Sequence, residues 1–494
     1  MKTALERRSG GVLLHPSSLP GPGFCGDFGE NAHRFVDFLA RAGLGIWQVL
    51  PLGPTHSDLC PYQSFSIHAG NPDYIDLYWL VGRGWLSPQD ADRGQVDAGA
   101  KQRALRLGCT AFHSRVESEP ESAMAQAYAA FMRSADLWLE DYARFRAFRA
   151  CFSQQPWSSW PDSLRDCETA ACAERARQLK SEIGEICFQQ FVFHCQWTEL
   201  RHYAHERGVL LFGDVPIYVH LESADVWAHQ ALFDLDARGQ PVTVTGVPPD
   251  YFSSEGQLWG NPQYNWELMR ETGFQWWLQR LASARRQFDI IRIDHFRALD
   301  AYWEIPVTAI SAKEGKWVAA PGRELLQCAF QQFPDLCLVA ENLGSISPEV
   351  EALRQEFSLP GMCVLQFAFD GNPDNPYLPH KHSSGDIVYT GTHDNNTTQG
   401  WFDGLTDELR DKVYEYFSNT QEEMPWMLIR QVMASVANTA IIPMQDYLEL
   451  GGEHRMNTPG TTTGNWRWRF AWNQVPEDLA VRVRDLLATY DRLQ

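Results

Sequence analysis

Short apolar runs recur along the chain, and each of them ends on or leads into a polar residue. They are too short for helices, and they lack the strict alternation of a strand that has one face in water. Such runs are typical of strands that are buried on both faces of a parallel sheet. The eight runs occupy residues 11–15, 46–50, 209–214, 290–294, 337–341, 362–367, 386–390 and 440–446.

Helical patterns lie between several of these runs. Phe35, Leu39 and Ala42 fall on one face of a helix that Gly43 would end. Eight buried strands that alternate with helices predict an α/β fold, a (β/α)8 TIM barrel, in which functional residues lie at the carboxyl ends of the strands. A doubly wound sheet remains an alternative, although no Gly-x-Gly-x-x-Gly fingerprint directly follows a strand.

Two intervals between the runs are too long for simple connections. Residues 51–208 read as mostly helical and predict an insertion between strands two and three. Residues 215–287 predict a second insertion, which carries a loop rich in proline and glycine at 246–262 and then a helix. We therefore expect a single barrel over 1–494 with inserted, largely α-helical subdomains, and not a string of independent domains.

Three carboxylates follow three of the predicted strands: Asp294, Glu341 and Asp394. In a barrel they would meet at one mouth, where one can attack an anomeric carbon, one can protonate the leaving oxygen and one can stabilise the distorted sugar. Arg292 faces the same way as Asp294 and would hold it ionised, whereas Glu341 needs a raised pKa to stay protonated.

The same residues also have purely structural interpretations. A strand-end aspartate beside an arginine is often a structural ion pair, and a strand-end glutamate is often a helix or loop contact. Metal binding is the competing chemical use, but the His-Glu-x-x-His spacing is absent. The presence of all three carboxylates, with His295 and His393 beside two of them, favours a catalytic site.

Charge and cysteine content narrow the class of protein. The 494 residues carry 42 Lys and Arg against 62 Asp and Glu, and this net charge of −20 argues against a nucleic-acid or anionic-membrane partner. No apolar stretch approaches the roughly 18 residues of a membrane span, and the first eight residues show no signal-peptide pattern. Eleven scattered cysteines without a Cys-x-x-Cys pair predict reduced thiols and a cytoplasmic location.

The loop at 246–262 also carries aromatic residues. Tyr251 and Trp259 could form a rim that stacks on sugar rings, or the loop could simply pack over the barrel. Composition alone favours neither reading.

Several long motifs complete the picture, and with them the chain closely resembles glycoside hydrolase family 77, the family of 4-alpha-glucanotransferases or amylomaltases. The resemblance runs along nearly the whole chain and implies a barrel without a C-terminal β-sandwich domain, with no cofactor and no metal. The motifs are LLHPSSLPG, CPYQSFSIHAGNP, GDVPIYV, GVPPDYFSSEGQLWGNP, RIDHFR, AENLG, GTHDNNT and NTPGTTTGNWRWR.

The resemblance also implies residue roles. Asp294 would be the nucleophile, Glu341 the general acid/base and Asp394 the transition-state stabiliser. The implied contacts to the sugar chain are Tyr62, Asp214, Asp250, Tyr251, Gln257, Trp259, Arg292, His295, His393 and Asn465.

The implied reaction is retaining transfer of α-1,4-glucan segments from a maltooligosaccharide or starch chain to the 4-hydroxyl of glucose or another glucan, through a covalent glycosyl-aspartate. Water could attack the same intermediate, so the preference for transfer rests on the resemblance. Two alternatives stay open. One is a hydrolase of the α-amylase type or a branching-type enzyme on the same scaffold, and the other is a non-catalytic glucan-binding protein.

Overall fold

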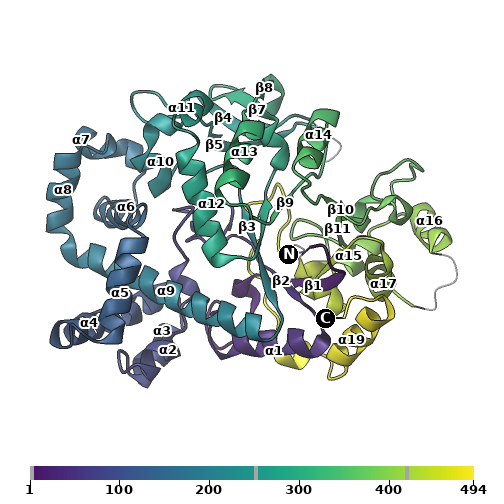
Figure 1. Cartoon of the computed structure of the whole chain (residues 1–494), viewed down its shortest axis with the longest axis horizontal. Helices are drawn as coiled ribbons and strands as arrows, with labels where there is room; N and C mark the ends of the chain where they lie inside the picture. Colours follow the sequence, from purple (N-terminus) through teal and green to yellow (C-terminus); the bar gives the residue numbers. More distant parts are fainter. Residues whose placement is uncertain (1–4, 250–253, 418–421, 494) are drawn as a thin grey trace.

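The computed structural model describes residues 5–249, 254–417 and 422–493 (Figure 1). In this part of the chain all eight predicted runs form strands, and these pair in parallel in the order β10-β11-β12-β1-β2-β3-β6-β9. The strands are β1 (Ser9–Leu13), β2 (Ile46–Gln48), β3 (Leu210–Val215), β6 (Ile290–Ile293), β9 (Leu338–Ala340), β10 (Met362–Val364), β11 (Ile387–Tyr389) and β12 (Thr439–Pro443).

Hydrogen bonds join the two ends of this strand order. The N–H of Ala340, at the end of β9, donates to the carbonyl of Pro360, two residues before β10, at 2.9 Å. The side-chain oxygen of Asn342 accepts from the N–H of Met362 at 2.8 Å. The sheet therefore closes into a barrel, and the predicted fold class is confirmed.

Successive side chains along each barrel strand point to opposite faces of the sheet, so the core has two parts. One buried cluster takes a residue from every barrel strand and fills the interior. These residues are Leu13, Ile46, Phe212, Ile290, Val339, Val364, Ile387 and Ile441. Their sequence neighbours, such as Val12 and Ile291, belong to the larger cluster that also contains helix residues. Burial on both faces explains why the strands read as continuous apolar runs.

Helices cover the outside of the barrel and extend well beyond it on one side, where α4–α8 form a group in Figure 1. Gly43 ends α1 in the left-handed conformation, at φ 74°, as its position predicts. The helices before β6 are α1 (Glu30–Ala42), α2 (Leu77–Gly82), α3 (Pro88–Gly94), α4 (Ala98–Ser118), α5 (Ala123–Ser134), α6 (Leu139–Cys151), α7 (Asp162–Arg165), α8 (Thr169–Gln178), α9 (Lys180–Glu206), α10 (Ala224–Ala228), α11 (Trp266–Glu271) and α12 (Gln275–Gln287).

The helices after β6 lie between or after the remaining barrel strands, although no α-helix lies in the described residues between β10 and β11. They are α13 (Gly322–Gln332), α14 (Pro348–Glu356), α15 (Thr398–Asp403), α16 (Asp407–Tyr416), α17 (Trp426–Ala434), α18 (Met444–Tyr447) and α19 (Leu479–Thr489). The described residues after β12 contain no further strand, and α19 packs against α1. Nowhere in the described ranges is a helix both long and apolar enough to cross a bilayer.

A second, antiparallel sheet lies over the barrel and differs from the sequence prediction. Its strand order is β5-β4-β7-β8, formed by β4 (Thr243–Val247), β5 (Gln257–Pro262), β7 (Ala301–Pro306) and β8 (Lys316–Ala319). The sequence predicts a loop over 246–262 and no strand between 294 and 337. β8 has only four residues and is mostly exposed, so it offers no buried apolar run, and only pairing with β7 makes it a strand.

Candidate active site

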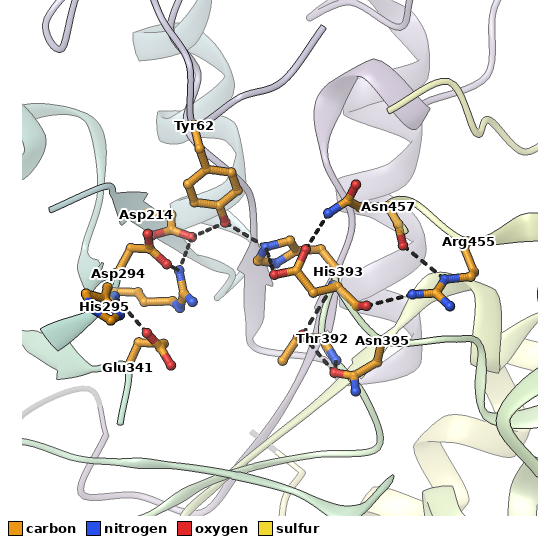
Figure 2. Close-up of polar contacts among 12 residues, drawn as sticks. Tyr62, Asp214, Asp294, His295, Glu341, Thr392, His393, Asn395, Arg455 and Asn457 are labelled. Atoms are coloured by element: carbon orange, nitrogen blue, oxygen red, sulfur yellow. Dashed lines mark hydrogen bonds and ion pairs between the residues drawn. The ribbon is translucent and has the colours of Figure 1, made fainter. Parts of the chain in front are cut away.

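Side chains at the carboxyl ends of the barrel strands meet in one space (Figure 2). Asp214 and Arg292 lie on β3 and β6, and the register of these strands places them opposite each other. Ile293 is opposite Ala340 in the pairing of β6 with β9, so Asp294 and Glu341 follow directly at neighbouring strand ends. The barrel therefore brings the first two predicted carboxylates together through strand register.

Arg292 connects two carboxylates. Its Nη1 lies 2.7 Å from Oδ2 of Asp214 and 2.8 Å from Oδ1 of Asp294. The side chain of Asp214 is 0% exposed and that of Asp294 is 26% exposed. Burial raises the pKa of Asp214 to about 6, against the opposing effect of Arg292. Asp294 is thus charge-paired, and it is the carboxylate of this group that reaches the open cleft.

Glu341 occupies a different environment from Asp294. It is buried and accepts hydrogen bonds from the backbone N–H groups of His295 at 2.7 Å and Leu343 at 2.9 Å. Burial raises the pKa of Glu341 to about 7; the charge of Asp294 adds to this rise, while Arg292 opposes it. At neutral pH this carboxyl group can therefore hold or release a proton.

The turn after Asp294 shapes the site around His295. This residue has left-handed backbone angles, φ 49° and ψ 50°, and its amide donates to Glu341. Burial lowers the pKa of the His295 imidazole to about 4, so the ring is neutral at physiological pH. A non-glycine residue in this conformation is uncommon and is often found at functional sites.

Tyr62 lies between the two sides of the cleft. Its hydroxyl donates to Oδ2 of Asp214 at 2.8 Å and lies 2.9 Å from Nε2 of His393 (Figure 2). The Tyr62 and His393 rings are stacked, with centroids 5.2 Å apart. An aromatic face beside charged groups is the arrangement that a sugar ring requires.

Asp394 lies on the segment after β11 and is half exposed, at 50% of its side-chain area. Desolvation acts to raise the pKa of Asp394, but the neighbouring His393 and hydrogen bonds from His393 and Asn457 outweigh it and hold the pKa below its usual range. Burial acts to lower the pKa of the His393 imidazole, but the charge of Asp394 outweighs this effect and raises the pKa. Asp394 therefore stays ionised at neutral pH.

Two residues that the sequence does not single out contact Asp394. Asn457 donates to Oδ1 of Asp394 at 2.6 Å, and Arg455 donates to its backbone carbonyl at 2.8 Å (Figure 2). The signal was present, because Asn457 begins the motif NTPGTTTGNWRWR. Asn465, the predicted contact from the same motif, instead accepts from the N–H of Thr458 and donates to the carbonyl of Thr461, within its own loop.

The small sheet delivers two further predicted residues. Trp259 on β5 places its ring edge-on to His295, with centroids 4.9 Å apart, and its indole N–H donates to Gln257 at 3.0 Å. Asp250 and Tyr251, predicted from the same motif, lie outside the described residues. Within the described ranges, no group of three or more His, Cys, Asp or Glu side chains is arranged to hold a metal ion.

Comparisons with known proteins identify the family of the chain. A model of glycoside hydrolase family 77, 4-alpha-glucanotransferase, matches residues 14–474. The chain is 44% identical to a 4-alpha-glucanotransferase of Thermus thermophilus over 98% of this chain and 99% of that one, and 42% identical to one of Synechocystis over 99% of each. It superposes on an amylomaltase from Streptococcus agalactiae in complex with acarbose with a TM-score of 0.94, at 36% identity over 99% of this chain and 100% of that one. The chain belongs to glycoside hydrolase family 77, the 4-alpha-glucanotransferases.

Proposed function

We propose that this chain is a retaining 4-α-glucanotransferase that moves α-1,4-linked glucan segments from a donor maltooligosaccharide or starch chain to the 4-hydroxyl of glucose or another glucan. One observation carries the mechanism. Two neighbouring carboxyl groups occupy opposite environments, since Asp294 is paired with Arg292 while burial raises the pKa of Glu341 to about 7. Such a pair divides into a nucleophile and a proton donor.

In the first step Asp294 attacks the anomeric carbon of the donor. The glycosidic C1–O4 bond breaks, and Glu341 gives its proton to the departing O4, so the leaving sugar chain ends in a free 4-hydroxyl. Positive charge develops on the ring in the transition state, and the ionised Asp394 stabilises it. The product of this step is a glycosyl group bound covalently to Asp294.

The second step reverses the first with a new partner. Glu341, now ionised, takes the proton of an incoming 4-hydroxyl, whose oxygen bonds to C1 while the bond from C1 to Asp294 breaks. Two displacements at C1 retain its configuration. Retention requires the carboxyl groups of Asp294 and Glu341 to lie about 5–5.5 Å apart.

The choice between a sugar and water as acceptor separates the transferase from a hydrolase of the α-amylase type. Family membership supports transfer, as do relatives named 4-alpha-glucanotransferase at 38–44% identity. The structure with acarbose supports an α-glucan as the ligand class of the cleft. The aromatic groups of Tyr62, beside His393, and Trp259, beside His295, would hold the acceptor and exclude water.

The test is to incubate the purified protein with maltotriose alone and to follow glucose, the product ladder and the total of reducing ends. Glucose together with longer maltooligosaccharides at a constant number of reducing ends is expected. A rising number of reducing ends would instead establish the hydrolase. No change in any of the three would leave only glucan binding and overturn both enzymatic readings.

The cysteines support a reducing compartment, and we infer the cytoplasm. All eleven lie in the described part of the chain and are free thiols. Disulfide bonds are rare where thiol reductants are maintained. Thiol titration of the freshly isolated protein under denaturing conditions should count eleven, and a lower count would contradict this inference.

A further inference from the structure

A buried carboxylate fastens the segment that carries Asp394. This segment, residues 391–397, follows β11 and leads into α15. The Oδ2 atom of Asp446 accepts from the hydroxyls of Thr390 at 2.5 Å and Thr398 at 2.6 Å, one residue before and one residue after the segment. Its Oδ1 atom accepts from the N–H of Thr398 at 2.7 Å. One side chain thus ties both ends of the segment together.

The environment of Asp446 is unusual for a charged group. The residue is 1% exposed, it belongs to α18 directly after β12, and its three hydrogen-bond donors are all neutral. Burial raises the pKa of Asp446 above its usual range, although the bonds from Thr390 and Thr398 oppose this rise. Burying a carboxylate without a cation costs free energy that a threonine or asparagine at this position would not, so stability alone gives no reason for it.

The 391–397 segment needs such a tie because it is not a strand. Asp394 lies five residues beyond the end of β11, where no sheet register fixes it. Other bonds act on parts of the segment. The side chain of Asn395 accepts from the N–H of Thr392 at 2.9 Å, and Gln366 donates to the carbonyl of Asn396 at 2.9 Å. Of these contacts, only those made by Asp446 join the two ends of the segment.

We propose that Asp446 is a positioning residue for glycosyl transfer, which sets the place of Asp394 and His393 against the reacting sugar by holding Thr390 to Thr398. This inference rests on the proposed function. Asp446 is buried and bonds to Thr390 and Thr398, not to the three carboxylates of the site, so its effect passes through the backbone of the segment. Charge-assisted hydrogen bonds are short and directional, which suits them to this task.

The kinetic consequence distinguishes positioning from stability. Asp394 acts on charge that develops in the transition state, so displacing it weakens binding of the transition state more than binding of the substrate. We expect Asp446→Asn to lower kcat on the order of 10- to 100-fold while KM changes by no more than about 3-fold. A residue that only stabilised the fold would lower the active fraction and leave kcat per folded molecule unchanged.

The experiment measures kcat and KM for maltotriose disproportionation, per folded molecule and well below the unfolding temperature. Thr398→Val removes one hydroxyl from the tie and should lower kcat, and Thr398→Ser should restore it. The matched control is Asp289→Asn. Asp289 is a second carboxylate that joins elements, because it accepts from the N–H of Leu211 and pairs with Arg201, but it lies at the opposite end of the barrel. This variant should lower the melting temperature without lowering kcat.

The outcomes separate clearly. The inference is overturned if Asp446→Asn and Thr398→Val lower kcat no more than Asp289→Asn does, or if they raise KM at constant kcat. Should Asp446→Asn not fold, the comparison of Thr398→Val with Thr398→Ser decides in its place. Failure of the proposed function would show in the products of the unaltered protein, whereas failure of this inference shows only in the variants.

Discussion

The two sides of the cleft hold their charged groups by different means. On one side Asp214, Arg292 and Glu341 lie on barrel strands or directly after them, and they are buried. On the other side Asp394 lies five residues beyond β11 and is half exposed. Strand register places the first group, while Asp394 receives a side-chain hydrogen bond from Asn457, and Asp446 accepts hydrogen bonds from the threonines that flank its segment.

This difference has a physical basis. Neighbouring parallel strands fix their residues to within the spacing of the backbone ladder, and a packed core resists displacement. A segment outside the sheet has no such ladder, so its geometry depends on a few individual hydrogen bonds, each worth about 1–3 kcal/mol when one partner is charged. We therefore expect changes at the buried strand-side residues to affect both chemistry and stability, and changes on the segment side to affect rate in smaller steps.

The largest effect should come from Asp294→Asn. An amide cannot form the glycosyl intermediate, so kcat should fall by at least about 10⁴-fold, with circular dichroism and melting temperature close to those of the unaltered protein. Single-turnover assays with maltotriose measure the loss. Substantial surviving activity would remove Asp294 from the role of nucleophile.

Arg292→Met, on the strand side, should lower the stability of the protein. It leaves the fully buried Asp214 without its cation, so the free energy of unfolding in urea at pH 7 should fall by about 3–5 kcal/mol. The loss should be smaller at pH 5, because protonation of Asp214 then removes the uncompensated charge.

Two further variants provide reference values for the loss of stability expected of Arg292→Met. Arg83→Met breaks the surface pair with Glu199, in which the side chains are 29% and 50% exposed, and should cost no more than about 1 kcal/mol. Asp394→Asn, on the segment side, should also change the free energy of unfolding little. A large loss there would mean that the two sides of the cleft are equally part of the core.

The pH dependence tests the environment of Glu341. Burial raises its pKa from 4.5 to about 7, and the protonated form is the proton donor in the first step. Activity is therefore present below this pKa and lost above it, and kcat/KM should fall about tenfold per pH unit above about pH 7. The stability that this proton contributes is likewise lost as the pH rises through about 7. A break near pH 4.5, the ordinary value, would contradict the assignment.

The smallest effect concerns Asn457 on the segment side. Asn457→Ala removes one of the hydrogen bonds to the Asp394 carboxylate and should lower kcat about tenfold, with little change in melting temperature. Asn465→Ala is the control from the same motif, because the bonds of Asn465 lie within its own loop. A larger loss of activity in the Asn465 variant would mean that Asn465 contacts the sugar, as the family resemblance implies.

The strand side of the site could be predicted from the sequence to a large extent. Each barrel strand is a local apolar run, and the residue after it is the one that reaches the mouth, so Asp294 and Glu341 could be found without a structure. The small sheet could not be found in this way. Its strands pair Thr243 with Pro306 and Trp303 with Trp317, and β8 is mostly exposed, so the sheet does not show the continuous buried runs of the barrel strands.

The contacts that hold the segment side escaped prediction for a related reason. Asn457 contacts a residue 63 positions away, and Asp446 contacts residues 48 and 56 positions away. Nothing near these residues in the sequence indicates their partners. Asn465 shows the converse, because its place in a motif suggested a contact with the sugar while its hydrogen bonds in the structure are local.

By itself, the sequence determined the eight strands, the barrel they form and the three carboxylates that follow them. The order of apolar and polar residues along the chain is sufficient to indicate which short segments are buried strands. Only the tertiary structure decided which residues hold those carboxylates and what pKa they acquire. These properties depend on burial and on hydrogen bonds between segments that are far apart along the chain, and such contacts exist only once the barrel has closed.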